Sequence, residues 1–449
     1  MAELADAQDS KSCPRKRVWV QFPPSALKLK DEKMVWGRSF LCFCLLLCFL
    51  GNAIADTFTN KKTGEQFDGY AAKIANRTKL AVRNAAREGI RQIEPSDYDV
   101  VYNAEGRRKQ VYVIELNEPL LLECETQAFE KAIKTAENQG NLAIVIKIDT
   151  PGGRIDLMKR YCSAIASVDI TPVIAVVCGG KNGGAYSAGA IIAMGCDELY
   201  MEKNSVIGAA TLVVIDANDG LKSAKSKYGE DIGEKFDSAH RAYCANIAEQ
   251  AGRSGLIAQA MIDRQFEVVA VKNENGDYQI CDGRDAKNNT DKDSIIVNRE
   301  GSLLTLTAKM AADIGFADSQ IESFNEWRQN GPLAENKWIS SQDIRTARRQ
   351  YLMYDKRFQA AANEIQQLDL KISIAISKNE NASYVFQQRE LTNQKIIEVR
   401  NNLSKMIGQF KTIISLKKSC ADLPVELSEM ESQLSQLTSI SEELMKMLR

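Results

Sequence analysis

The residue best placed to do chemistry in this chain is Ser187, which lies among small residues in the segment 183–190. The apolar run at 172–177 predicts a buried strand before it, and the run at 190–194 predicts the start of a buried helix after it. A serine at such a strand-to-helix transition exposes its hydroxyl above the first N–H groups of the helix. Those groups and the helix dipole can stabilise a developing oxyanion, so the segment suits a nucleophile. A tight turn that only packs small residues has the same composition.

Three other segments can contribute to the same site. The turn at 149–153 closes a predicted buried strand, and its glycines, Gly152 and Gly153, can present backbone N–H groups to an oxyanion because no Cβ blocks the approach. The small residues at 204–210 form another strand end that can border a cleft. Lys235 lies at the start of a further predicted helix.

Taken together and in this order, these blocks resemble the NfeD-type, ClpP-class serine peptidases over about residues 110–320. The matching blocks are Ile146–Arg154, Ala185–Gly189, Ser205–Ala210, Glu234-Lys235, Ala251–Arg253, Leu303–Ala308 and Ile314–Asp318. The resemblance implies the Clp protease/crotonase fold and a Ser–Lys dyad, with Ser187 as nucleophile and Lys235 as general base. It also implies that the backbone N–H groups of Gly152 and Ala188 hold the oxyanion, without a cofactor or a metal.

The shortage of histidine bears on the choice of base. His240 is the only histidine in the chain, so a Ser-His-Asp triad would have to use it, and a His-rich metal site is excluded. Residues five apart on a helix lie about 140° around from each other, so His240 and Lys235 cannot both face Ser187. A lysine becomes a base when desolvation lowers its pKa toward neutrality. We expect His240 to have a surface or helix-packing role. Three alternative bases lie in a polar stretch and are expected to be solvated: Lys222, Lys225 and Lys227.

An alternation of strands and helices would position these residues. Strands are predicted at 111–116, 142–148 and 172–177, and helices at 125–139, 155–167 and 236–250. Strands that helices cover on both faces are nearly continuous apolar runs, so the pattern predicts an α/β domain with a parallel sheet. The polar segment at 271–300 is predicted to be a solvated loop or a hairpin.

The regions on either side differ in composition from this domain, which we assign to residues 110–330. Residues 56–105 alternate polar and apolar residues and predict a small β-rich module. Residues 338–449 carry apolar residues at alternating three- and four-residue steps, which predicts a C-terminal α-helical coiled-coil tail. Such a tail serves assembly or binds a partner; the alternative is that it folds back on the catalytic domain.

The beginning of the chain resembles a secretory signal. A basic flank precedes the apolar run at 40–50, and an Ala-x-Ala pattern ends at Ala55, which predicts a signal peptide over 34–55. Residues 1–33 are polar, and we expect them to be a non-native upstream extension. The predicted location is therefore periplasmic or secreted, after cleavage near Ala55. If the signal is not cleaved, it would tether the protein to a membrane.

Composition excludes several classes of protein. The net charge of −1 and the hydrophobic content of 44% are those of a globular protein, without a basic stripe for nucleic acid. No run of about 18 apolar residues follows Ala55, so no stable membrane span is expected in the mature chain. The cysteines after Ala55 are scattered without C-x-x-C spacing, which predicts buried free thiols rather than disulfides or a zinc site.

These observations predict a secreted or periplasmic serine endopeptidase that hydrolyses polypeptides through an acyl-enzyme, as a homo-oligomer, with a possible protein partner on the C-terminal helices. Tyr186 departs from the family, which usually has a small residue there, and would narrow the cleft. One alternative is a catalytically inactive ClpP-like scaffold that assembles with partners through the tail. Another is an acyl-CoA enzyme of the crotonase type, which has the fold but no use for a serine–lysine pair.

Overall fold

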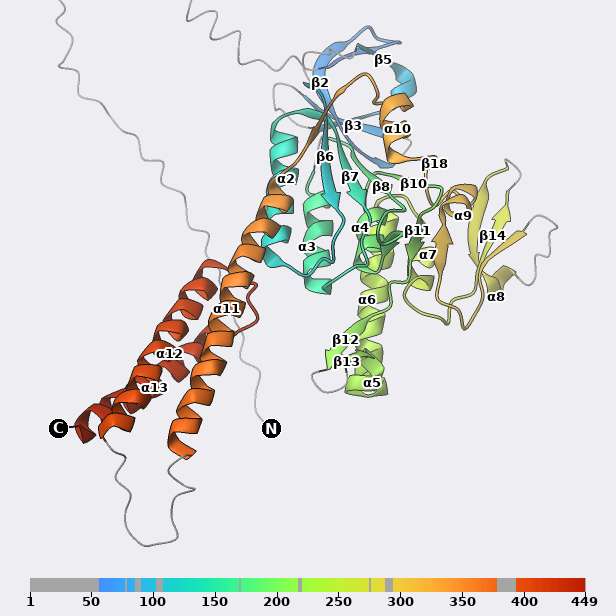
Figure 1. Cartoon of the computed structure of the whole chain (residues 1–449). Coiled ribbons are helices and arrows are strands. Elements are labelled where there is room, and N and C mark those ends of the chain that lie inside the picture. The colour runs from blue at the N-terminus through green and yellow to red at the C-terminus, as the bar shows by residue number, and fades with distance from the viewer. Residues whose placement is uncertain are drawn as a thin grey trace, which may run out of the picture. The chain divides into compact units, whose positions relative to one another are not determined.

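The computed structural model describes residues 56–448, except for the segments 77–78, 85–89, 102–107, 169–170, 217–219, 274–275, 287–293 and 378–392. The predicted upstream extension and signal peptide, at 1–33 and 34–55, lie outside the described residues. Figure 1 shows, in chain order, a small β-sheet module, a mixed α/β domain and a set of long C-terminal helices. None of the described helices combines the length and the apolar character needed to cross a bilayer.

The first module is an antiparallel sheet with strand order β4-β3-β2-β1-β5. Its strands are β1 (Asp56–Asn60), β2 (Gln66–Asn76), β3 (Lys79–Asn84), β4 (Ile90–Ile93) and β5 (Tyr98–Val101), with a 3₁₀ turn, η1 (Pro95–Asp97). Phe58 is fully buried and stacks on Phe67 with ring centroids 5.3 Å apart. This aromatic pair and Ile93 form the small core of the module.

The α/β domain is built on six strands in the order β18-β10-β8-β7-β6-β19, and every pairing in the sheet is parallel. The strands are β6 (Arg108–Leu116), β7 (Asn141–Ile148), β8 (Val173–Val177), β10 (Glu198–Glu202), β18 (Ser319–Ile321) and β19 (Lys337–Ser340). Every residue of β8 is buried, as expected for a strand covered on both faces. The mixed α/β fold predicted from the alternating pattern is confirmed.

Alternate residues of the sheet pack against helices on opposite faces. Ile114 and Ile146 belong to the core that includes α2 (Glu123–Asn138) and α3 (Ile155–Ala166). Val113 and Val145 pack on the other face, where α10 (Phe324–Asn330) contributes Trp327. This two-sided burial fixes the register of the strands, so the turns after β7 and β8 are held at the same carboxyl edge.

A second, smaller sheet lies at the predicted site. It consists of β9 (Gly184–Tyr186), β11 (Val206–Gly208) and β17 (Thr305–Thr307), and β9 leads into α4 (Ala188–Met194). The following elements are β12 (Val213–Asp216), β13 (Gly220–Ser223), α5 (Ala224–Tyr228), α6 (Glu230–Gln250), α7 (Gly255–Ala260) and α9 (Ala308–Asp313). The polar segment expected to be a loop or hairpin contains most of a three-stranded sheet: β14 (Val268–Lys272), β15 (Tyr278–Asp282) and β16 (Ser294–Asn298), with α8 (Gly283–Ala286).

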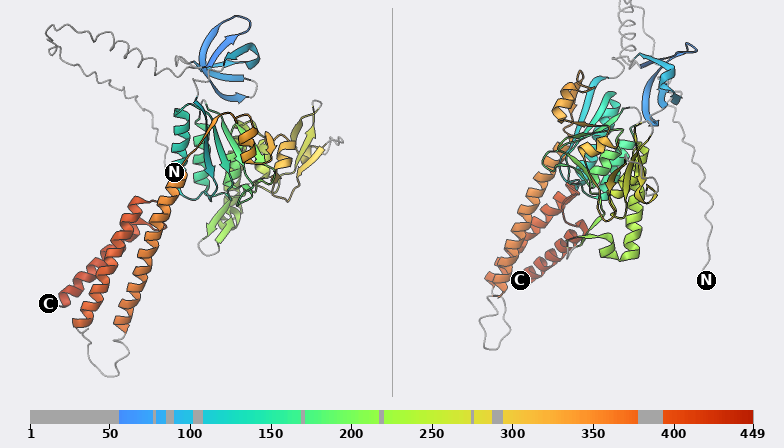
Figure 2. Two further views of the ribbon diagram at one scale, coloured as in Figure 1. Left: turned by 45° about the horizontal axis from the view of Figure 1, so that its top comes forward. Right: turned by 90° about the vertical axis from the view of Figure 1, so that its right-hand side faces the viewer.

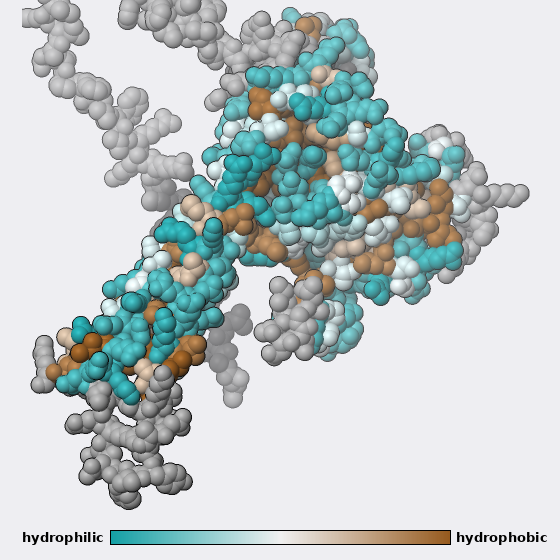
Figure 3. All heavy atoms as spheres, viewed as in Figure 1, coloured by the Kyte–Doolittle hydropathy of each residue, from teal (hydrophilic) through white to brown (hydrophobic). Residues whose placement is uncertain are grey.

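The C-terminal region consists of α11 (Asp343–Ser377), α12 (Asn393–Ser419) and α13 (Leu427–Met447). The two views of Figure 2 show the three helices side by side, and apolar residues between them, including Leu368, Met406 and Phe410, are buried. The predicted helical tail is therefore present, and its classification as a coiled coil stays a prediction. In Figure 3 brown, hydrophobic residues gather near the far end of these helices. Leu370, Ile376, Ile397 and Ile440 are among the exposed apolar residues of the tail.

Candidate active site

Ser187 lies in the turn between β9 and α4 and has an unusual backbone conformation. Its φ is 53° and its ψ is −122°, a region that residues with a Cβ rarely adopt and that costs about 1–3 kcal/mol. The Ser187 N–H donates to the carbonyl of Gly208, on β11, at 3.0 Å. Two sheet strands and the start of a helix therefore hold this serine in a strained conformation, as is common for residues at functional sites.

The glycine turn after β7 lies directly against this serine. A Cβ at Gly152 would lie 2.6 Å from Ser187 Cβ and 3.1 Å from Ser187 Oγ, and the φ of Gly152 is +101°. No residue with a side chain fits there. The Gly152 N–H, however, donates to Thr150 Oγ1 at 3.2 Å, so in this conformation the predicted oxyanion donor has an internal partner.

Gly153 is oriented differently from Gly152. Leu120 forms a parallel bridge to Gly153 by donating its N–H to the Gly152 carbonyl at 2.9 Å and accepting from the Arg154 N–H at 3.0 Å. In such a bridge the N–H of Gly153 points away from Leu120, because neighbouring peptide groups alternate in direction. A Cβ at Gly153 would lie 2.1 Å from the Leu120 carbonyl oxygen, so this close approach also requires glycine.

A small cavity of about 30 Å³ adjoins Ser187. Its lining includes Gly153, Ala188, Ala210 and His240, together with the apolar residues Ile155, Met158, Ile191 and Val213. The backbone N–H of Ala188 belongs to the first turn of α4, where N–H groups have no partner within the helix. The strand end at 204–210, which the sequence predicted as a cleft border, reaches the cavity through Ala210.

His240 is the residue whose position differs most from expectation. A surface role was one of two expectations, but the side chain is 8% exposed and lines the Ser187 cavity. Burial lowers the pKa of His240 from its usual 6.5, and a hydrogen bond to the Ala210 backbone opposes this shift. Cys244 Sγ lies 3.8 Å from each ring nitrogen. The cavity therefore contains a neutral imidazole at neutral pH.

Lys235 lies on a different side of α6 from His240. Its side chain is exposed and does not line the cavity, and its neighbours Ile232 and Phe236 are 51% and 52% exposed. The expectation that both residues cannot face Ser187 from one helix holds, but the structure brings His240 to the serine and leaves Lys235 outside. Among the alternative bases, Lys225 contacts Glu234 at 2.8 Å and Glu230 at 3.1 Å. These hydrogen bonds raise the pKa of Lys225, so it is a poor base.

The segment before β9 is held by Asp149, at the end of β7. This carboxylate is 7% exposed and accepts hydrogen bonds from the N–H groups of Asn182, at 3.1 and 3.2 Å, and of Gly184, at 3.3 Å. The Asn182 side chain donates to the Asp149 carbonyl at 2.6 Å. Asp149 thus joins the glycine turn to β9, the strand that leads to Ser187.

Residues 110–300 match the model of a protein family described as NfeD1b, N-terminal domain. The chain is 29% identical over 140 residues to the membrane-bound protease PH1510 of Pyrococcus horikoshii, which is 31% of this chain and 30% of that protein. It is 28% identical over 231 residues to the membrane protein NfeD1b of Bacillus subtilis, which is 51% of this chain and 47% of that protein. The chain thus spans less than half the length of either relative.

Among solved structures, two variants of the 1510-N membrane-bound stomatin-specific protease, one of them in complex with a substrate peptide, give TM-scores of 0.36 and 0.35 at 22% identity. These alignments cover 51% of this chain and 96% and 90% of the solved chains. On the sequence matches, residues 110–300 of this chain are an NfeD-family N-terminal domain.

Proposed function

We propose that this protein is a serine peptidase that hydrolyses polypeptides through an acyl-enzyme on Ser187. The observation that carries the proposal is the strained backbone of Ser187, directly against a glycine turn that tolerates no side chain. Such strain is costly and persists at sites where a side chain must be presented in one orientation. The family match supports the same chemistry, because the relative PH1510 is a membrane-bound protease.

In the proposed reaction, Ser187 Oγ attacks the scissile carbonyl while a base takes its proton. The tetrahedral intermediate collapses as the base returns the proton to the leaving amine, and water then hydrolyses the ester. We propose that the N–H groups of Ala188 and Gly152 hold the oxyanion. The Gly152 N–H would exchange its neutral bond to Thr150 Oγ1 for a shorter, charge-assisted one. Gly153, which lines the cavity, offers a further N–H group.

The general base is assigned to Lys235 from the family resemblance. Because the Lys235 side chain is exposed, the first turns of α6 must rearrange when substrate binds or when subunits assemble. The large exposed apolar residues on the same stretch, Tyr228, Ile232 and Phe236, support such a rearrangement, since they would be buried in the process. A second candidate base is His240, which its place in the cavity supports.

The two bases are separated by variants and by a pH profile. We expect Ser187→Ala and Lys235→Met to abolish hydrolysis of a peptide library, and His240→Gln to retain it. A lysine base gives a rate that keeps rising above pH 7, whereas an imidazole of lowered pKa gives a rate that is already constant there. Full activity in Lys235→Met, together with loss in His240→Gln, would transfer the role to His240.

We further propose that the protein acts in the periplasm or outside the cell, as a homo-oligomer. The membrane-bound relatives support tethering through the apolar run at 40–50 if the signal is retained. The exposed apolar residues at the far end of the tail support its use as an assembly or partner surface. Fractionation of the native host and sedimentation of the purified protein test these two points. A folded protein that hydrolyses no peptide would favour the inactive scaffold.

A further inference from the structure

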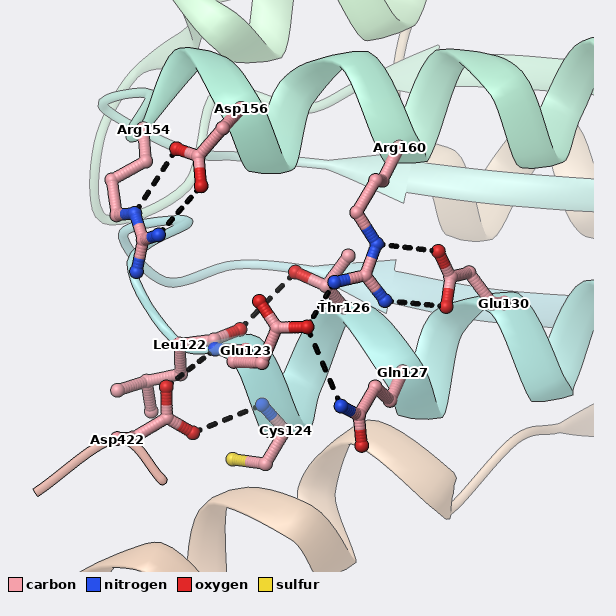
Figure 4. Close-up of polar contacts among 10 residues, drawn as sticks. All are labelled: Leu122, Glu123, Cys124, Thr126, Gln127, Glu130, Arg154, Asp156, Arg160 and Asp422. Atoms are coloured by element: carbon pink, nitrogen blue, oxygen red, sulfur yellow. Dashed lines mark hydrogen bonds and ion pairs between the residues drawn. The ribbon is translucent and has the colours of Figure 1, made fainter. Parts of the chain in front are cut away.

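A carboxylate from the far end of the chain caps the start of α2. Leu122 is the N-cap residue of α2, and its side chain accepts no hydrogen bond. Figure 4 shows that Asp422, in the turn between α12 and α13, accepts instead from the backbone N–H groups of Glu123, at 2.6 Å, and Cys124, at 3.0 Å. The first N–H groups of a helix otherwise lack partners, and a negative charge there is favourable. The tail therefore completes a helix of the catalytic domain.

A second contact holds the tail to the same helix. Arg348 of α11 pairs with both carboxylate oxygens of Glu125, one of them at 2.9 Å. Glu125 is 3% exposed, and a buried carboxylate of this kind is stable only with a partner. The exposed Lys131 and the half-buried Asp343 add an ion pair at 3.1 Å. Two separate parts of the tail thus contact α2.

The start of α2 is also fixed from the side of the catalytic domain. Arg160 of α3 pairs with both carboxylate oxygens of Glu130, at 2.7 and 2.6 Å, and with Glu123 (Figure 4). Glu123 is also one of the two residues that donate a backbone hydrogen bond to the Asp422 carboxylate. The beginning of α2 is therefore held between α3 and the tail.

The start of α2 leads directly to the glycine turn. Only Leu121 and Leu122 separate α2 from Leu120, whose N–H and carbonyl bond to Gly152 and Arg154 at 2.9 and 3.0 Å. Gly152 in turn lies against Ser187. A continuous series of short contacts therefore runs from the Asp422 carboxylate to the serine.

We propose that the helical tail positions the oxyanion turn of the peptidase site, with Asp422 as the positioning residue. The inference rests on the function proposed above. With Asp422 in place, the segment 119–122 has one conformation, and Leu120 holds Gly152 and Gly153 against Ser187. Without the carboxylate the first turn of α2 frays, the pairing between Leu120 and Gly153 loosens, and the oxyanion donors are misplaced when the acyl-enzyme forms.

The test compares full-length variants by two measurements. Asp422→Ala removes both carboxylate oxygens that accept from the start of α2. Asp369→Ala is the matched control, because Asp369 is an exposed carboxylate on α11. The first measurement is the rate at which a fluorophosphonate labels Ser187, resolved into a maximal rate and a half-saturating concentration. The second is amide hydrogen exchange at residues 120–125 and 152–154.

We expect Asp422→Ala to lower the maximal labelling rate about tenfold. Full removal of one oxyanion donor lowers kcat by a factor of roughly 10²–10³, and a misplaced donor should lose less than a missing one. The half-saturating concentration should stay within about twofold, which a general loss of structure would not produce. Exchange should increase at both segments, and Asp369→Ala should resemble the wild type. If Asp422→Ala unfolds, Asp422→Asn provides the measurement, since it keeps one acceptor and should show a smaller effect in the same direction.

Two results would overturn the inference: a wild-type labelling rate in Asp422→Ala, or unchanged exchange at 152–154. A different result would overturn the proposed function alone. If Ser187 of the wild type takes up no label while Asp422→Ala still raises exchange at 152–154, the tail positions the turn but the serine is no nucleophile.

Discussion

Replacing Ser187 by glycine should leave the fold more stable than replacing it by alanine, although both remove the hydroxyl. At φ 53° and ψ −122°, the Cβ of Ser187 strains the backbone, whereas glycine adopts positive φ without strain. The side chain is only half-buried, so little packing is lost with the Cβ. The sign of the difference between the two variants therefore reports the strain itself.

The magnitude follows from two opposing terms. A residue with a Cβ in such a region costs about 1–3 kcal/mol. Glycine destabilises relative to alanine by about 0.4–1 kcal/mol through the greater freedom of the unfolded chain. The net expectation is that Ser187→Gly exceeds Ser187→Ala by about 0.5–2 kcal/mol in free energy of unfolding.

The assay is urea or guanidinium denaturation of the two variants, followed by the fluorescence of Trp327 and Trp338, which lie in the α/β domain. The matched pair is Ser163→Gly and Ser163→Ala, since Ser163 is exposed on α3 and has ordinary helical neighbours. There alanine should be the more stable variant, by about 0.5–1 kcal/mol. If alanine is also the more stable residue at position 187, Ser187 is not strained and the main support for a nucleophile is lost.

Three further predictions concern buried residues of the α/β domain. Gly152→Ala should lower the free energy of unfolding by about 2–4 kcal/mol and abolish hydrolysis, because its Cβ would lie 2.6 Å from Ser187 Cβ and 2.9 Å from the Tyr186 carbonyl oxygen. Denaturation and peptide assays check this prediction, and a stable, active variant would contradict it. Burial lowers the pKa of His240 in the folded state, where its ionisable neighbours are Lys159 of α3 and Cys244 of α6. The unfolded state therefore binds the imidazole proton more tightly than the folded state does. The free energy of unfolding should fall as the pH drops through about 6.5. His240→Gln should flatten the dependence of unfolding free energy on pH between about 7 and 5.5, and an unchanged slope would refute the burial of a neutral imidazole. Arg253, whose side chain is 1% exposed, donates to the carbonyls of Met194, Cys196 and Phe316 and pairs with Asp318. Arg253→Met should lower the free energy of unfolding by about 3 kcal/mol or more, as measured by thermal unfolding. Arg264 is an exposed arginine, so Arg264→Met serves as the control and should cost little.

The strand ends and turns of the site were predictable because local sequence determines them. An apolar run followed by glycines, as at 142–153, must end a buried strand in a turn. The small residues around Ser187 likewise allow a close approach of strands and helix. The helical tail was predictable for the same reason, since its apolar spacing depends only on the helical repeat.

The side of α6 that faces Ser187 was not recognised, although a signal existed. The buried residues of this helix include Gly233, His240, Cys244 and Ile247, which are spaced as one helical stripe. Glycine and histidine interrupt the apolar pattern, so the stripe is easy to miss, and the role of Lys235 as general base came from the family resemblance. The position of Lys235 as general base stays a prediction.

The contact between Asp422 and α2 could not be predicted from sequence. Asp422 and Glu123 are 299 positions apart, and neither residue belongs to a pattern that requires the other. Their meeting depends on how the tail docks, which is set by many side chains together.

The central claim is that Ser187 is the nucleophile, and site mapping of a covalent label tests it most directly. Full-length protein, its Ser187→Ala variant and a Ser163→Ala control are treated with a fluorophosphonate and digested, and the modified peptide is identified by mass spectrometry. We predict a single adduct on Ser187 in the wild type and the control, and none in Ser187→Ala, which should also hydrolyse no peptide. An adduct elsewhere, or peptide hydrolysis that survives Ser187→Ala, would contradict the account.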